Sequence, residues 1–430
     1  MSEYDVVVIG AGLAGLRCAT RLAEAGRDVV VLEAEDAVGG RERTDVVDGF
    51  RLDRGFHVLN PAYPAVRRWV DVGALALRRF PVALSVRLDD GVARIAHPLR
   101  HPATIPASLG SGLVRPADLL PLARWALPVL ANPRAVKRGP DRRLAEAWDR
   151  AGLRGTLRES VLEPFLAGVL ADDRQESSDI FVRLLVRSFA LGAPGVPAAG
   201  IGALPAQLAD TARRAGAGIR LSHRVTATRP HGRGWRIEIE NADAIDTRAV
   251  VLATGLTPGL DVPLPRPRGL QTWWFATDER HHDDGALRVD GLRRGPIVHT
   301  AIVSNTAPTY APRGRHLVEA TVVLPTTATE ADVRRHLEEL WGTDTRPWRL
   351  LRRDDIAAAL PAQEPAAASA ASGPPRRRAV RRQRPPRHRL DPGRARLRAA
   401  SGRGCVARPR VTRPFPVSEV GVRVAACDSS

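Results

Sequence analysis

The feature that most constrains the fold of this chain is the stretch YDVVVIGAGLAGL near its start. Residues 6–9 form a short, β-branched run that is typical of a buried parallel strand. Three glycines follow at the spacing G-x-G-x-x-G: Gly10, Gly12 and Gly15. An apolar helical pattern then runs to Gly26, and the stretch DVVVLE predicts a second strand that closes on Glu33. The order strand, glycine loop, helix, strand and acid predicts a dinucleotide-binding βαβ unit.

Each part of this unit has a mechanical role. The first glycine permits a tight turn, the second lets the backbone approach a pyrophosphate, and the third lets helix and strand pack closely. The free N–H groups and dipole of the helix N-terminus favour phosphate. Glu33 can accept hydrogen bonds from the ribose hydroxyls, and its charge argues against the 2′-phosphate of NADP. The candidate nucleotide-binding residues are Gly10, Ala11, Gly12, Leu13, Ala14, Gly15 and Glu33.

Two further segments separate FAD from NAD. The first, AEDAVGGRERT, contains a glycine doublet followed by Arg41, and the second is GFRLDRGFHVLNPAYP, residues 49–64. With these segments the chain resembles the superfamily of flavin-containing amine oxidases and phytoene desaturases, which also includes protoporphyrinogen oxidases. The resemblance implies non-covalent FAD and an α/β fold, in which a Rossmann-like FAD-binding domain carries an inserted α+β substrate domain.

The resemblance also carries functional residues over to this sequence. It places the pyrophosphate of FAD beside Gly39, Gly40 and Arg41. It places the flavin near Gly55, Phe56 and His57, and it implies that the backbone of Val225 contacts the adenine. The chemistry of Arg41 agrees, because a guanidinium is a natural bidentate partner of a diphosphate. For His57, a structural role competes with proton transfer.

The domain organisation is predicted to alternate along the chain. Residues 1–60 and 195–260 would form the FAD-binding domain, and residues 61–194 and 261–350 the substrate domain. The first substrate segment reads as mostly helical, with short strands near residues 82–92. The second contains alternating strand patterns such as PIVHTAIVSN, which predict an antiparallel floor under the substrate.

One amphipathic stretch, ADLLPLARWALPVLA at residues 117–131, is interrupted by Pro121 and Pro128. We expect it to be a core or lid helix of the substrate domain, broken at its prolines. The alternative is that it faces a membrane, as in relatives that act on lipid-soluble substrates.

The chemistry left to the protein is limited, because a flavin performs the redox step itself. No catalytic residue is identified, and the spacing of the three cysteines predicts no metal site. Many amine oxidases of the superfamily use a lysine near the flavin, but this chain has no lysine after Lys137. This favours removal of hydride from a hydrophobic substrate, as in carotenoid desaturases or isomerases, over an amine oxidase lacking the usual lysine.

The end of the chain, residues 366–430, is rich in Arg, Pro and Ala. Residues 371–410 hold 14 Arg and one Asp, which accounts for most of the net charge of +18. A nucleic-acid-binding tail is therefore one hypothesis, although the remaining chain is only modestly basic and contains no recognition module.

The genetic code supports another interpretation of this tail. The superfamily ends with a flavin-binding segment that is missing here. Reading the underlying DNA one nucleotide downstream allows the residues D-T-A-S-I-Q-G-A-L-V-S-G-R to replace residues 387–399, and this matches the missing ending. We therefore expect a frameshift between about residues 365 and 380, and a chain that, as written, has an uncovered sheet edge and binds FAD poorly.

The setting of the protein is expected to be the cytoplasm. No targeting segment is evident, no apolar run reaches the roughly 18 residues of a spanning helix, and the cysteines form no disulfide pattern. Peripheral membrane contact is the alternative. The expected partner is a small, hydrophobic molecule rather than a specific nucleic acid.

Overall fold

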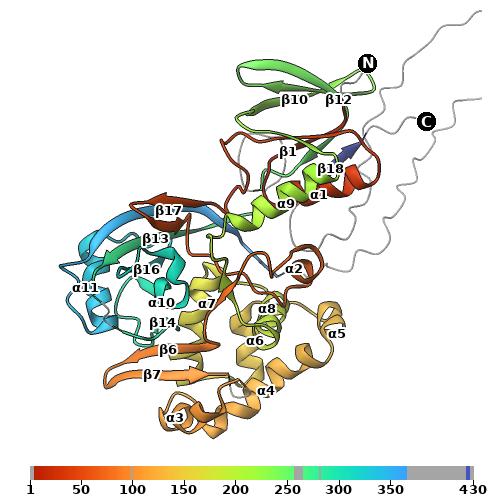
Figure 1. Ribbon diagram of the computed structural model, residues 1–430. Coiled ribbons are helices and arrows are strands. Elements are labelled where there is room, and N and C mark those ends of the chain that lie inside the picture. The colour runs from red at the N-terminus through yellow and green to blue at the C-terminus, as the bar shows by residue number, and fades with distance from the viewer. Residues whose placement is uncertain (1–3, 98–99, 256–264, 280–281, 366–422, 427–430) are drawn as a thin grey trace, which may run out of the picture.

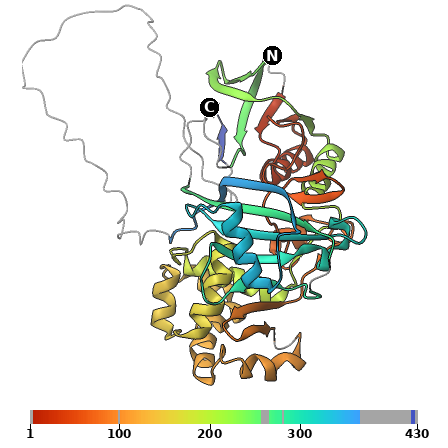
Figure 2. The same cartoon turned by 90° about the vertical axis from the view of Figure 1, so that its left-hand side faces the viewer.

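The computed structural model describes residues 4–97, 100–255, 265–279, 282–365 and 423–426. These residues form two large sheets that lie at different ends of the molecule, with a helical layer beside the second sheet (Figures 1 and 2). We call them the N-terminal sheet and the floor sheet. The frameshift interpretation falls almost wholly on residues outside those described.

The N-terminal sheet has the strand order β10-β11-β12-β1-β2-β9, and β18 pairs with β12 outside this path. Its strands are β1 (Tyr4–Ile9), β2 (Val29–Leu32), β9 (Gly218–Arg220), β10 (Val225–His231), β11 (Gly234–Ile239), β12 (Ala242–Leu252) and β18 (Arg423–Ala426). The valine-rich β1 lies between two parallel neighbours, β2 and β12, and is buried along most of its length. The predicted βαβ unit is confirmed, and β10 and β11 form the expected hairpin.

Two helices lie side by side on one face of this sheet, α1 (Leu13–Glu24) and α9 (Ala203–Arg214) (Figure 1). Their small and apolar residues pack with the sheet valines into one core, because alanine and glycine allow a close approach of the backbones. This packing fixes the N-terminus of α1 at the carboxyl end of β1.

The edge of the N-terminal sheet differs from expectation at one place. Residues 249–252 of β12 pair with β1 on one side and with β18, antiparallel, on the other. The prediction of an uncovered edge is therefore wrong at these four residues, since a short strand from the arginine-rich tail satisfies their backbone groups.

The floor sheet has the order β17-β13-β16-β15-β14-β6-β7. Its strands are β6 (Ala83–Leu88), β7 (Gly91–Ala96), β13 (Pro267–Thr277), β14 (Leu287–Asp290), β15 (Ile297–Ile302), β16 (His316–Val323) and β17 (Arg349–Pro361). Most neighbours are antiparallel, as predicted, but β14 and β6 are parallel. Helix α11 (Glu330–Trp341) packs on the face that carries Trp273 and Phe275, whereas Trp274 points to the opposite face.

Between β7 and β8 the chain is mostly helical, as expected. Helices α3 (Ile105–Gly110), α4 (Pro116–Ala131), α5 (Pro133–Arg138), α6 (Leu144–Ala151), α7 (Glu163–Leu170) and α8 (Asp179–Leu191) form this layer. The expected break of the amphipathic stretch is wrong, because α4 runs without interruption through Pro121 and Pro128. Its Trp125 and Val129 are buried, and Trp125 belongs to the helical core, which confirms a core role for one face of the helix.

Shorter elements connect the two sheets. The hairpin β3 (Thr44–Val47) and β4 (Phe50–Asp53) is followed by α2 (Pro64–Trp69), and β5 (Arg78–Arg79) pairs with β8 (Gly195–Val196). Among the described residues, no helix has the length and apolar character needed to cross a bilayer.

Candidate cofactor and substrate site

The first turn of the predicted nucleotide loop can be built only with glycine at two positions. Gly10 has φ of +103°, and a Cβ there would lie 2.8 Å from the carbonyl oxygen of Ala253. A Cβ on Gly15 would lie 1.9 Å from the carbonyl oxygen of Gly10, which is far inside contact distance. These two glycines therefore set the close packing of α1 on β1 and β12.

Gly12 serves a different purpose, because the space beside it is open. A Cβ on Gly12 would meet only the carbonyl oxygen of Gly39, at 4.0 Å. The Gly39 N–H donates to the Ala11 carbonyl at 2.9 Å, and Gly40 lies against the Cα of Gly12. The structure thus brings the two predicted glycine motifs together.

The N-terminus of α1 begins beside this loop and has no side-chain cap. Leu13 and Ala14 are the first residues of this helix, and no acidic side chain lies in the first turn. Uncapped N–H groups next to open backbone make a suitable cradle for a pyrophosphate.

Glu33 follows β2 directly and is buried at the same edge. One carboxylate oxygen accepts the Ala11 N–H at 2.6 Å, and the other accepts the Glu35 N–H at 3.0 Å. Each oxygen keeps a further lone pair for a ribose hydroxyl. The carbonyl of Glu33 accepts the His223 N–H at 2.7 Å, which brings the start of β10, with Val225, to this side of the sheet.

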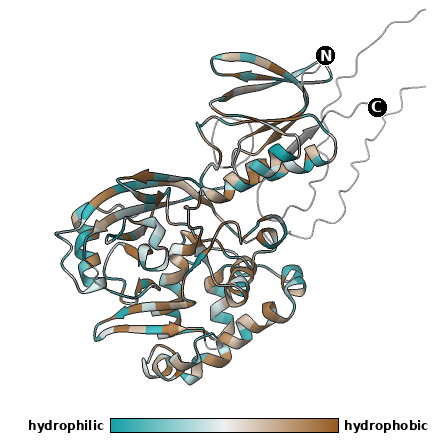
Figure 3. Ribbon diagram, in the orientation of Figure 1, coloured by the Kyte–Doolittle hydropathy of each residue, from teal (hydrophilic) through white to brown (hydrophobic). Residues whose placement is uncertain are grey.

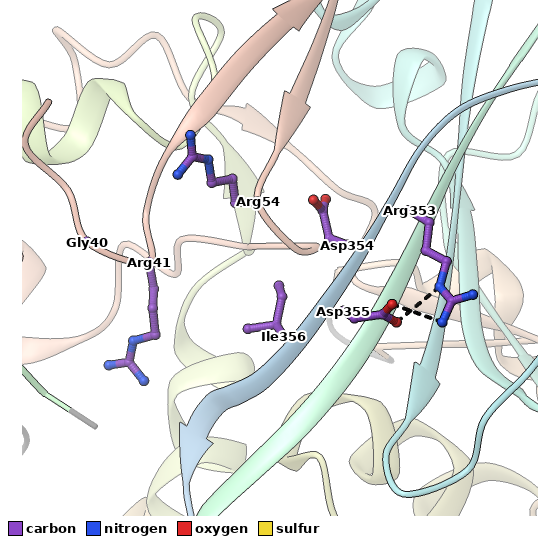
Figure 4. Close-up of a pocket in the computed structure, with 7 residues that line it drawn as sticks. All are labelled: Gly40, Arg41, Arg54, Arg353, Asp354, Asp355 and Ile356. Carbon is purple, nitrogen blue, oxygen red and sulfur yellow. Dashed lines mark hydrogen bonds and ion pairs between the residues drawn. The ribbon is translucent and has the colours of Figure 1, made fainter. Parts of the chain in front are cut away.

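A pocket of about 310 Å³ opens between the glycine doublet and β17 (Figure 4). It is lined by Gly40, Arg41, Arg54, Arg353, Asp354, Asp355 and Ile356. The Arg41 guanidinium donates to the carbonyl of Ala359 at 2.8 Å. Arg41 thus ties the glycine doublet to the floor sheet, while its remaining N–H groups are available to a ligand. Burial raises the pKa of Asp354, so its ionisation is disfavoured in this pocket.

The segment from Gly55 to His57 lies against the floor sheet. Gly55 has φ of +93°, and a Cβ there would lie 2.9 Å from Cδ1 of Ile356. The His57 ring is 3.0 Å from the Arg54 carbonyl oxygen, which indicates a role in holding the turn. The Phe56 ring contacts Phe80 and His299, with centroid distances of 5.9 and 5.4 Å. The structure therefore joins this predicted motif to the floor sheet.

A buried carboxylate that sequence reasoning missed anchors this segment. Asp53 accepts hydrogen bonds from the Thr44 hydroxyl at 2.6 Å, the Ile201 N–H at 3.0 Å and the Tyr310 hydroxyl at 2.9 Å. Burial raises the pKa of Asp53, and these donors offset part of the rise. Burial and the nearby carboxylate raise the pKa of Tyr310. The signal was present, because Asp53 is the acid of the G-F-x-x-D-x-G-x-H segment.

Comparison with known proteins assigns the chain to a family. The model of the family "Flavin containing amine oxidoreductase" matches residues 13–354. The chain belongs to this family. It is therefore an FAD-dependent oxidoreductase, and the predicted fold class and non-covalent FAD cofactor are confirmed.

Individual relatives differ in how much of the chain they match. A phytoene dehydrogenase of Streptomyces griseus is 29% identical over 408 residues, which cover 83% of this chain and 78% of the relative. A putrescine oxidase of Kocuria rosea is 45% identical over 87 residues, but these cover only 20% of this chain and 18% of that protein.

Solved structures agree on the fold. An oxidoreductase from Methanosarcina mazei matches with a TM-score of 0.64 and 19% identity, covering 84% of this chain and 90% of the other. A structure of putrescine oxidase with bound putrescine matches with a TM-score of 0.55 and 18% identity, covering 83% and 89%. At these identities the likeness concerns the fold alone.

Proposed function

We propose that this chain removes a hydride from a largely hydrophobic organic substrate, in the manner of a carotenoid desaturase or isomerase. The observation that carries the proposal is the absence of lysine after Lys137, in a chain whose relatives include a phytoene dehydrogenase over most of its length.

In this proposal, FAD supplies the two-electron acceptor and the chain holds it in place. The pyrophosphate would be bound by the α1 N-terminus and by the two glycine motifs, including Gly39, Gly40 and Arg41. Glu33 would accept hydrogen bonds from the ribose, and the Val225 backbone would contact the adenine. The segment from Gly55 to His57 would lie at the flavin. The alternation of cofactor and substrate segments along the chain, with the boundaries given above, is part of the same proposal.

The test is anaerobic reduction of the flavin. Polyenes that carry a hydroxyl group, in detergent, and amines such as putrescine are mixed with the FAD-loaded protein, and bleaching of the flavin absorbance is followed. We expect polyenes to reduce the flavin and amines to leave it oxidised. Reduction by putrescine would instead favour the second candidate, an amine oxidase without the usual lysine. The local similarity to putrescine oxidase supports this second candidate.

The origin of the arginine-rich tail affects whether the chain as written can bind FAD. We propose that residues 366–430 derive from a shifted reading frame, so that part of the FAD cradle is lost. Resequencing the coding DNA and restoring the frame by one nucleotide tests this. We expect the restored protein to purify with stoichiometric FAD, and the chain as written to bind it weakly. A yellow, stoichiometric flavoprotein from the unaltered sequence would contradict the proposal.

A second proposal concerns where the enzyme works. Six of the ten large hydrophobic residues that are exposed in the described chain lie on α3 and α4: Ile105, Leu109, Leu119, Leu120, Leu127 and Leu130. These helices form one end of the molecule (Figures 1 and 3). Arg115, Arg124 and Arg134 lie in the same region, and Asp118 is buried and paired with Arg115. We infer that this surface contacts an anionic bilayer peripherally.

Vesicle sedimentation tests this contact with the full chain. The double variant Leu120→Ser/Leu127→Ser removes the two most exposed leucines, which are 66% and 58% exposed. It should lower binding to phosphatidylglycerol vesicles at 0.5 M salt, where attraction of the basic tail is screened. Leu191→Ser, at another exposed leucine, is the control. Equal binding of all three proteins would contradict the inference.

A further inference from the structure

A group of buried polar side chains lies on the floor sheet, on the face opposite α11. His299 on β15 and Glu319 on β16 are 5% and 0% exposed. The ring Nε2 of His299 lies 3.5 Å from a carboxylate oxygen of Glu319, which is too long for a good hydrogen bond. Thr272 on β13 is also fully buried, and its cross-strand neighbour is Thr321 of β16.

Several buried polar atoms of this group make no hydrogen bond within the described residues. They are both ring nitrogens of His299, one carboxylate oxygen of Glu319 and the hydroxyl of Thr272. The Thr321 hydroxyl donates to the other carboxylate oxygen of Glu319. Buried polar groups are nearly always paired, so a cluster of unpaired ones on adjacent strands indicates an absent hydrogen-bonding partner.

A second buried histidine next to the sheet provides a paired reference for His299, although the side-chain nitrogens Trp274 Nε1, Arg268 Nη2 and Arg288 Nε of the sheet also lack a hydrogen-bond partner. His336 on α11 is equally buried, yet both of its ring nitrogens are used. One accepts the Ile297 N–H at 3.1 Å, and the other lies 3.1 Å from the carboxylate of Asp290. The His336–Asp290 pair is a satisfied structural pair, and the His299–Glu319 pair is not.

The surroundings of His299 place the group beside the proposed substrate region. Its ring contacts Phe56 of the flavin-side segment on one side. On the other side it lies against Gly168 of α7, where a Cβ would come within 2.0 Å of the ring nitrogen Nδ1. Glycine at position 168 therefore leaves the space that the His299 ring occupies.

We propose that Thr272, His299 and Glu319 form the polar end of the substrate site, which binds a hydroxyl or amino group on an otherwise apolar substrate. This deepens the proposed function and rests on it for the position of the substrate. A pure hydrocarbon would leave these buried groups unpaired, whereas a hydrogen-bonding head group would satisfy them. Sites built in this way discriminate strongly against analogues that lack the polar group.

Binding of small probes to the full chain tests the proposal without flavin reduction. Cyclohexanol, cyclohexylamine and methylcyclohexane share size and shape and differ in the polar group, and their affinities are measured by ligand-observed NMR. We expect at least one polar probe to bind about tenfold more tightly than methylcyclohexane. Preference for cyclohexylamine assigns an amino group, and preference for cyclohexanol assigns a hydroxyl group.

Matched double variants connect the preference to these residues. In His299→Leu/Glu319→Gln the ratio of affinities for the polar probe and methylcyclohexane should fall to about one. In the control His336→Leu/Asp290→Asn the preference for the polar probe should persist. The melting temperature gives a second readout. The melting temperature of His299→Leu/Glu319→Gln should change little, because the polar atoms that it removes are unpaired. That of the control should fall by several degrees, because backbone donors lose their acceptors.

Two results would overturn the proposal. One is equal binding of the three probes, or a preference that survives in His299→Leu/Glu319→Gln. The other is an equal loss of melting temperature in both variants, which would show a structural pair bridged by water. If polar probes bind as expected but no polyene or amine reduces the flavin, the proposed function fails while this site stands.

Discussion

The two sheets of this protein build their sites in different ways. In the N-terminal sheet the candidate cofactor site is largely backbone, since Gly10, Gly12 and Gly15 shape the loop that leads into the uncapped start of α1. In the floor sheet the proposed substrate site consists of side chains such as His299 and Glu319, which are buried on the neighbouring strands β15 and β16. A backbone site tolerates almost no change at its glycines, whereas a side-chain site can be altered without loss of the fold.

The largest expected effect is at the backbone site. Gly15→Ala places a Cβ 1.9 Å from the Gly10 carbonyl oxygen, so α1 must move away from the sheet. We expect the free energy of unfolding to fall by about 3 kcal/mol, measured by chemical denaturation. Gly110→Ala is the control, because a Cβ added at Gly110 would meet no atom within 4 Å. Equal stability of the two variants would show that Gly15 does not set the close packing of α1 on the sheet.

The next largest effect is expected where the two regions meet, at Asp53. Asp53→Ala leaves the Ile201 N–H and the hydroxyls of Thr44 and Tyr310 without their acceptor. The free energy of unfolding should fall by about 2 kcal/mol. Asp53→Asn, which keeps an acceptor oxygen, should lose less. If alanine and asparagine behave alike, the network does not hold this segment.

Asp53 also predicts a dependence of stability on pH. Because burial raises its pKa in the folded state, folding favours the protonated acid. The contribution of Asp53 is therefore most favourable below its ordinary pKa, and it declines as pH rises from there to the raised value. Thermal melts at a series of pH values should show this decline in the wild type and a smaller one in Asp53→Asn. Identical profiles would contradict the prediction.

The smallest effect is expected at the start of α11. This helix packs on the face of the floor sheet opposite His299 and Glu319. The Thr329 hydroxyl accepts the Asp332 N–H at 3.2 Å, and the Asp332 carboxylate accepts the Thr329 N–H at 3.1 Å. Thr329→Ala should lower the free energy of unfolding by about 1 kcal/mol, whereas Thr329→Ser should retain most of it. Denaturant titration of both variants measures this difference. An equal loss in both would show that the side chain contributes through packing and not through its capping hydrogen bond.

The comparison also explains what could be predicted from the sequence. The βαβ unit was predictable because turn, helix start and terminal acid are all local in sequence, and Glu33 lies where its strand ends. His299 and Glu319 could not be paired in advance, since their contact depends on the register between β15 and β16. The continuous α4 was missed because packing of Trp125 and Val129 outweighs the local effect of two prolines. Asp53 was visible within a motif, but two of its three partners, Ile201 and Tyr310, come from distant segments.

The order of strands in the N-terminal sheet has a consequence for synthesis. Strand β1 can pair with β2 as soon as residue 32 has emerged, but its other neighbour, β12, ends only at Leu252. At about 5–20 residues per second, the ribosome needs roughly 10–40 seconds to make the intervening chain. During this time one side of β1, whose last four residues are all apolar, has no partner. The nascent chain is therefore most vulnerable to aggregation before the second half of its own sheet has been translated.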